Sequence, residues 1–117
     1  MNFLKKYKLS IIWALIMLLA TTMKPSDEMP KFEIPYFDKI VHFGIFGVLG
    51  FLISYEKRSS YYNTLILCAL YGVAIEIIQS FLPWRSFEWA DMLADTLGAL
   101  AGILVAKYLI GFAKNLK

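Results

Sequence analysis

Four long apolar segments dominate the chain and leave few folds open to it. They cover residues 9–23, 39–55, 61–82 and 90–112. A helix rises about 1.5 Å per residue, so segments of about 17–23 residues span about 25–35 Å, close to the roughly 30 Å of a bilayer's hydrocarbon core. Strands are excluded, because an open apolar sheet leaves edge groups without hydrogen bonds in lipid, and the segments are too long and too few for a barrel.

The amount of apolar sequence leads to the same conclusion. Hydrophobic residues make up 59% of the 117 residues, against about 45–50% in a soluble domain. A soluble domain of this size buries only about two thirds of its unfolded surface, so the excess must face lipid. We therefore predict a single all-α domain over residues 1–117, a bundle of four transmembrane helices joined by a loop at about 24–38 and a turn at about 83–89.

Basic residues predict how this bundle lies in the membrane. Four spans put both termini on one side, and that side holds eight of the 12 basic residues. Because positive charge is retained in the cytoplasm, we predict a multi-pass protein of the cell membrane with both termini cytoplasmic. The eight are Lys5, Lys6, Lys8, Lys57, Arg58, Lys107, Lys114 and Lys117, and the other four are Lys24, Lys31, Lys39 and Arg85.

The first apolar segment has a second interpretation. A basic start, a short apolar run and the residues Ala-Thr-Thr also fit a cleaved signal peptide covering about residues 1–22. The small-residue cleavage signal is poor, which favours a retained helix. The orientation of the other helices is the same in both cases.

The net charge of +3 does not predict nucleic-acid binding. Such binding requires basic residues on one solvated face, interleaved with aromatic residues, whereas the basic residues here lie at the ends of apolar segments. The single cysteine, Cys68, lies midway along a segment, where we expect it to pack as a small apolar residue.

Polar and ionisable residues gather near the outer ends of three segments. Pairs spaced by three or four residues share a helix face, and the helix rise places all of them within about 10 Å of the outer surface. A charged side chain at the bilayer centre costs about 2.5–3.5 kcal/mol, so such residues must be paired or wetted. The candidate site residues are Asp38, Lys39, His42, Glu76, Gln79, Arg85, Asp91 and Asp95.

Small residues predict how the helices approach one another. Ala94, Gly98, Gly102 and Ala106 repeat every four residues, Gly72 and Ala69 continue the Glu76 face, and Gly44, Gly47 and Gly50 lie in the second segment. Small residues at such spacing allow close contact of helix backbones in lipid. We expect this packing to turn the charged faces inward, and the stripes also offer a surface for pairing of two chains.

The pattern of these residues resembles that of the VanZ-like family of small bacterial membrane proteins. The resemblance covers about residues 36–106. It is carried by Asp38-Lys-x-x-His42-Phe43, Glu76-x-x-Gln79, Pro83-x-Arg85, Asp91 and Thr96-x-Gly98. The family favours asparagine where this chain has Asp95. Its founding member is associated with low-level resistance to the glycopeptide antibiotic teicoplanin, so the resemblance implies a role at the cell envelope without a defined mechanism.

Three interpretations of the polar residues are open. One is a structural network that holds the bundle together. The second is an outward pocket, rimmed by Tyr36, Trp84, Phe87 and Trp89, that binds an amphiphile such as a membrane lipid, a cell-wall precursor or a glycopeptide. In it, Arg85 and Lys39 hold phosphate or carboxylate groups, and the acids hold amines or hydroxyls.

The third interpretation is an enzyme that acts on a lipid-linked substrate. Glu76 is then the general base and His42 the general acid. Oxygen-rich ligands at His42, Glu76, Asp91 and Asp95 suit a divalent metal chemically, but no metal-ligand motif of known spacing is present, so we predict neither a metal nor a cofactor. Ser86, in the turn near Glu88, is the only hydroxyl well placed for a nucleophile, and it fits turn chemistry better than nucleophilic catalysis. Transport is disfavoured, because the inner halves of the segments contain no polar path.

Overall fold

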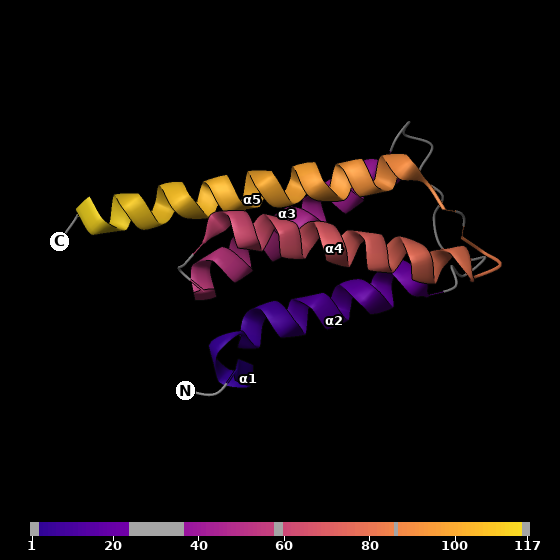
Figure 1. The fold of residues 1–117 in the computed structure, drawn as a ribbon, viewed down its shortest axis with the longest axis horizontal. Helices are drawn as coiled ribbons and strands as arrows, with labels where there is room; N and C mark the ends of the chain where they lie inside the picture. Colours follow the sequence, from indigo (N-terminus) through magenta and orange to yellow (C-terminus); the bar gives the residue numbers. More distant parts are fainter. Residues whose placement is uncertain (1–2, 24–36, 58–59, 86, 116–117) are drawn as a thin grey trace.

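The computed structural model describes residues 3–23, 37–57, 60–85 and 87–115, and every regular element in these ranges is helical (Figure 1). This confirms the predicted all-α class. The predicted loop lies outside the described residues up to position 36, and so do Tyr36, Arg58 and Ser86. The helices are α1 (Phe3–Lys6), α2 (Lys8–Thr22), α3 (Phe37–Lys57), α4 (Tyr61–Ser80) and α5 (Trp89–Asn115).

Three of these helices are long and apolar enough to cross a membrane. Their candidate spans are Asp38–Glu56, Tyr61–Ser80 and Trp89–Ala113. α2 is also apolar but has only 15 residues. α4 ends at Ser80, two residues earlier than predicted, because the amides of Phe81 and Leu82 turn back to the carbonyls of Ile78 and Gln79.

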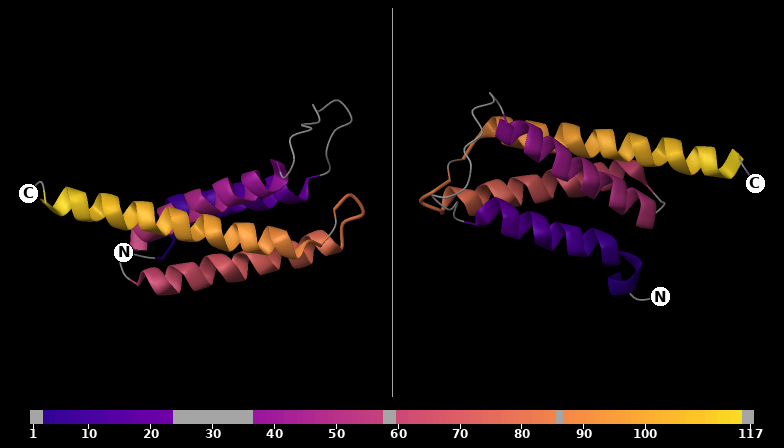
Figure 2. Two further views of the ribbon diagram at one scale, coloured as in Figure 1. Left: turned by 90° about the horizontal axis from the view of Figure 1, so that it is seen from above. Right: turned by 180° about the vertical axis from the view of Figure 1, so that it is seen from behind.

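Helices α2, α3, α4 and α5 alternate in direction along the bundle (Figures 1 and 2). The end of α2, the start of α3, the end of α4 and the start of α5 therefore meet at one end of the molecule, which we call the polar end. The charged residues of the sequence prediction belong to these helix termini.

Helices α3 and α5 are in backbone contact through glycines. A Cβ atom added at Gly98 would overlap the carbonyl oxygen of Phe43, and one at Gly102 would overlap that of Gly47. At Gly50 it would lie 2.5 Å from the carbonyl oxygen of Ala99. The predicted role of the small residues is thus confirmed at these positions. It is wrong for Gly44, whose Cβ would meet no atom within 4 Å.

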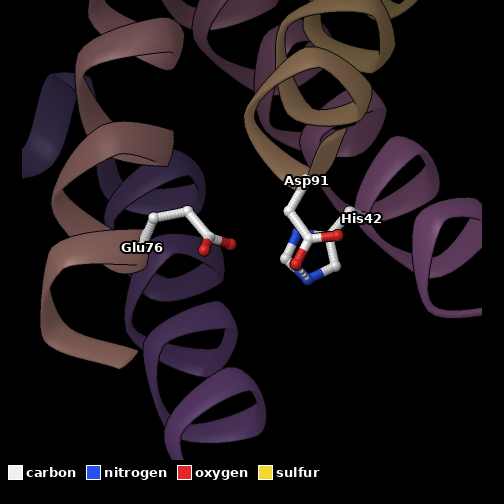
Figure 3. A group of neighbouring side chains, drawn as sticks. All are labelled: His42, Glu76 and Asp91. Atoms are coloured by element: carbon white, nitrogen blue, oxygen red, sulfur yellow. Dashed lines mark ion pairs between the residues drawn. The ribbon is translucent and has the colours of Figure 1, made fainter. Parts of the chain in front are cut away.

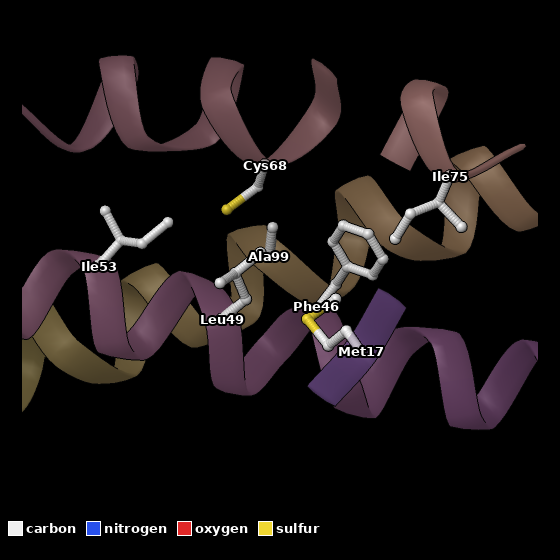
Figure 4. Close-up of a cluster of buried hydrophobic side chains, with 7 residues drawn as sticks. All are labelled: Met17, Phe46, Leu49, Ile53, Cys68, Ile75 and Ala99. Atoms are coloured by element: carbon white, nitrogen blue, oxygen red, sulfur yellow. The ribbon is translucent and has the colours of Figure 1, made fainter. Parts of the chain in front are cut away.

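A buried apolar core lies inward of the polar end (Figure 4). It joins α2, α3, α4 and α5, and Cys68 is one of its members, as expected for a small apolar residue. The core consists of Met17, Phe46, Leu49, Ile53, Cys68, Ile75 and Ala99.

Helix α2 is attached to the bundle by hydrogen bonds from side chains to backbone. Trp13 Nε1 donates to the carbonyl of Ile45 at 2.9 Å, and the Tyr71 hydroxyl donates to the carbonyl of Ala14 at 2.5 Å. At the polar end, Gln79 Nε2 donates to the carbonyl of Thr21 at 2.7 Å. Each bond satisfies a polar group that would otherwise be buried among apolar side chains.

At the opposite end, Glu56 of α3 caps the start of α2. Its carboxylate accepts from the amides of Leu9 and Ser10 at 2.9 and 2.7 Å and from the Ser10 hydroxyl at 2.5 Å. Tyr7, at the N-cap position, provides no side-chain hydrogen bond. A carboxylate distant in sequence thus satisfies amides at the positive end of the helix dipole.

The glycine contact leads to a prediction with a matched control. Gly98→Ala places a methyl group against backbone that has no room to move, so α3 and α5 must separate. We expect a loss of about 1–3 kcal/mol of stability, as in other overpacked interiors. Gly44→Ala makes the same chemical change in open space and should leave stability unchanged. Thermal unfolding of the purified protein in detergent measures both, and equal melting temperatures would contradict the packing described here.

Candidate functional site

Seven ionisable side chains come together at the polar end, and we call them the polar cluster. They come from the first turns of α3 and α5, the last turns of α4 and the turn before α5. Five carry carboxyl groups, against one ammonium and one imidazole. The members are Asp38, Lys39, His42, Glu76, Glu88, Asp91 and Asp95.

His42 and Asp95 form the most deeply buried pair of the polar cluster. His42 Nδ1 lies 2.7 Å from Asp95 Oδ1, and the two residues are 5% and 0% exposed. The other ring nitrogen, Nε2, faces Asp91 Oδ2 at 3.8 Å. A carboxylate bound to one ring nitrogen fixes the orientation of the imidazole and leaves the other nitrogen for chemistry.

The room for Asp95 is provided by Gly72 of α4. A Cβ atom at Gly72 would lie 2.9 Å from Asp95 Oδ2. This second oxygen is buried and has no hydrogen-bond partner among the described residues. Gly72 therefore allows a carboxylate between α4 and α5 where any larger residue would collide with it.

Glu76 is fully buried and faces His42 and Asp91 (Figure 3). One carboxylate oxygen, Oε2, accepts a hydrogen bond from the amide of Glu88 at 3.2 Å. The other, Oε1, has no partner among the described residues. One ligand-type atom from each of His42, Glu76 and Asp91 lies within 4.8 Å of the other two.

Lys39 is surrounded by carboxylates at the outer edge of the polar cluster. Its ammonium lies 2.7 Å from Asp38 Oδ2 and 2.8 Å from Asp91 Oδ1, and it also pairs with Glu88. The charge of Lys39 is thus already balanced within the chain. This limits its predicted role as a free anchor for a phosphate group.

Two predicted site residues lie outside this set of contacts. Gln79 is buried but donates to Thr21 of α2, so it joins helices rather than facing the ionisable groups. Arg85 makes no ion pair with any described residue, and its buried Nε has no hydrogen-bond partner there. Of the predicted aromatic rim, Trp84 donates to the carbonyl of Thr22 at 3.1 Å, and Phe87 packs edge-on against Trp89.

Glu88 belongs to the polar cluster, although it is not among the site residues predicted from the sequence. Its carboxylate pairs with Lys39, and its amide holds Glu76. The spacing of three residues between Glu88 and Asp91 was a usable signal, since residues so spaced share a helical face.

These features define an all-helical membrane protein with a partly buried polar cluster at one end of its helices. The chain belongs to the VanZ/LLP1 family, whose model matches residues 2–111. It is also similar to an uncharacterized protein of the fission yeast Schizosaccharomyces pombe, with 24% identity over 110 residues. That match covers 90% of this chain and 66% of the yeast protein, so similar sequences are not confined to bacteria. No solved structure matches the chain.

The His42–Asp95 pair leads to a prediction about stability. Asp95→Asn keeps an oxygen that accepts a hydrogen bond from His42 Nδ1–H. We expect this variant to remain as stable as the original protein. Asp95→Ala leaves the buried His42 without a partner and should cost about 1–3 kcal/mol. Thermal unfolding in detergent compares the two, and an Asp95→Asn variant as unstable as Asp95→Ala would contradict the hydrogen-bonding role.

Proposed function

We propose that the protein crosses the cell membrane four times and binds the polar head of an amphiphilic ligand at the polar end, on the extracytoplasmic side. The ligand class is a membrane lipid or a lipid-linked cell-wall precursor. The observation that carries the proposal is the position of the polar cluster. Lys39, which pairs with the buried Asp91, also lines an apolar groove.

The groove supports an amphiphilic ligand rather than a water-soluble one. It lies between α3 and α5, has a volume of about 310 Å³ and includes Phe43, Ala94 and Leu97 in its lining. Lys39 also lines it, so the same side chain borders the groove and pairs with the carboxylates of the polar cluster. An alkyl chain in the groove would bring its head group to the polar cluster. The acids there favour amines and hydroxyls in that head group.

The fourth span in this proposal is α2. Its 15 residues reach about 22 Å, which is short for a bilayer and requires local thinning or anchoring by flanking residues. Its hydrogen bonds to α3 and α4 and the burial of Met17 support a place within the bundle. An even number of spans, with eight of the 12 basic residues on the side of the termini, supports cytoplasmic termini.

A reporter at the C-terminus tests this topology. We expect a green fluorescent protein fusion at the C-terminus to fluoresce and an alkaline phosphatase fusion at the same position to be inactive. Both results follow from a cytoplasmic C-terminus, and a fusion to the turn after α4 should give the reverse pattern. An active phosphatase at the C-terminus would show that the orientation is inverted.

Lipid retention tests the proposed ligand. We expect protein extracted with its surrounding lipid into nanodiscs to be enriched in one lipid class relative to the bulk membrane, as measured by mass spectrometry. Ala94→Leu fills the groove and Asp91→Asn removes a buried charge, so both should lower the enrichment several-fold. Ala74→Leu, on an exposed part of α4, is the matched control.

Equal lipid composition in the nanodiscs and the bulk membrane would overturn the proposal. Displacement of the lipid by added teicoplanin would identify a glycopeptide as a competing ligand.

One observation favours catalysis as a second candidate function. Asp95 orients His42, and His42 Nε2 and Glu76 face the same small space, as a general acid and base require. Turnover of a purified lipid-linked substrate that is lost in Glu76→Gln, while lipid enrichment is retained, would identify an enzyme.

A purely structural role makes a different prediction for the same variant. If Glu76 only supports the fold, then Glu76→Gln, His42→Ala and Arg85→Ala should all lower membrane abundance, with no separate loss of ligand or turnover. Normal abundance of Glu76→Gln, together with loss of lipid enrichment, would exclude this role.

A further inference from the structure

We propose that His42, Glu76 and Asp91 bind a divalent transition-metal ion, of which zinc or manganese suits the ligands best. The expectation of no metal was drawn from spacing along the sequence. The fold brings the three residues together from three helices, a relation that spacing does not reveal.

Each of the three side chains has one polar atom engaged by the protein. Asp95 Oδ1 lies 2.7 Å from His42 Nδ1, Lys39 Nζ lies 2.8 Å from Asp91 Oδ1, and the Glu88 amide donates to Glu76 Oε2. The opposite atoms remain: His42 Nε2, Asp91 Oδ2 and Glu76 Oε1. Metal ligands in proteins are commonly held in this way, with a carboxylate on the far nitrogen of a ligating histidine.

The unpartnered oxygen of Glu76 is the observation that requires a ligand. Glu76 is 0% exposed, its Oε1 has no partner among the described residues, and its carboxylate points towards Asp91 and His42. Two buried carboxylates that face each other repel unless a proton or a cation lies between them. A divalent ion would neutralise both and complete the hydrogen-bonding capacity of the site.

The distances fit a single ion after a small contraction. Two donors bound to one metal at about 2.0–2.2 Å each lie between about 3 and 4.4 Å apart. His42 Nε2 and Asp91 Oδ2 are 3.8 Å apart, and one ligand atom from each of the three residues lies within 4.8 Å of the other two. One imidazole and two carboxylates suit zinc or manganese better than calcium, which prefers oxygen ligands alone.

A second acidic group at the polar end does not support the same conclusion. Asp38, Glu88 and Asp91 also lie close enough to share an ion. The ammonium of Lys39 contacts all three, so a cation of the chain already fills that position. In the inner set Asp91 also contacts Lys39, but Glu76 Oε1 has no partner among the described residues, and this difference locates the proposed metal.

The inference concerns the same residues as the proposed function but does not depend on a bound amphiphile. The test uses the full chain, purified in detergent with a tag free of histidine, loaded with zinc or manganese and dialysed. We expect about one ion per chain by elemental mass spectrometry, together with a rise in melting temperature that a chelator reverses, since a ligand that binds the native state stabilises it. Lipid enrichment is measured separately, so either proposal can fail alone.

Variants decide whether the ion lies at the proposed residues. Glu76→Gln, which is nearly isosteric, and His42→Ala should each lower the metal content at least tenfold. Asp95→Asn should weaken affinity by about 10–100-fold, the usual effect of altering a group behind a ligand. Asp38→Asn changes an acid outside the proposed set and should bind normally. If His42→Ala does not fold, Glu76→Gln decides the question. Absence of bound metal in the original protein, or an equal loss in Asp38→Asn, would overturn the proposal.

Discussion

The backbone contact between α3 and α5 is the constraint on which the rest of the structure depends. Gly98 and Gly102 allow the helices to approach until backbone meets backbone. In lipid there is no hydrophobic force between helices, so such close packing is a main source of association. Because His42 lies one residue before Phe43, whose carbonyl contacts Gly98, this contact also sets the level at which His42 meets Asp91 and Asp95. The residues that pack the bundle thus position its chemistry.

Helix α4 completes the arrangement from the other side. Gly72 leaves space for Asp95, and one helical turn later Glu76 reaches the same level as His42 and Asp91. Gln79, a further turn along, no longer meets the ionisable groups and instead holds the end of α2. α2 is therefore attached at both ends, by Gln79 and Trp84 at the polar end and by Glu56 at the other.

The sequence predicted the helices and the level of the charged groups, because apolar length and helical spacing are local properties. It did not predict which groups would pair. Arg85 is a predicted site residue, but it lies in a turn whose path depends on tertiary packing and makes no ion pair with any described residue, whereas Lys39 pairs with Asp38 and Asp91. Glu88 was not predicted for the same reason. Its contact with Glu76 is made by its backbone amide, whose position depends on the path of the turn. Gly44 has the spacing of a packing residue but lies on an open part of the helix.

The balance of charge links stability to function in this site. Five carboxyl groups share one ammonium and one imidazole at the polar end, and three of the five, on Glu76, Asp91 and Asp95, are buried. A cluster selected only for stability would be served better by apolar packing, because unpaired buried charge costs several kcal/mol. Lys39 pairs with Asp38, Glu88 and Asp91, whereas Glu76 Oε1 has no partner among the described residues, so the deficit of positive charge is greatest around Glu76. A metal ion, or the cationic group of a ligand, would remove that deficit on binding. Binding of such a cation would therefore account for buried acids that apolar packing does not require.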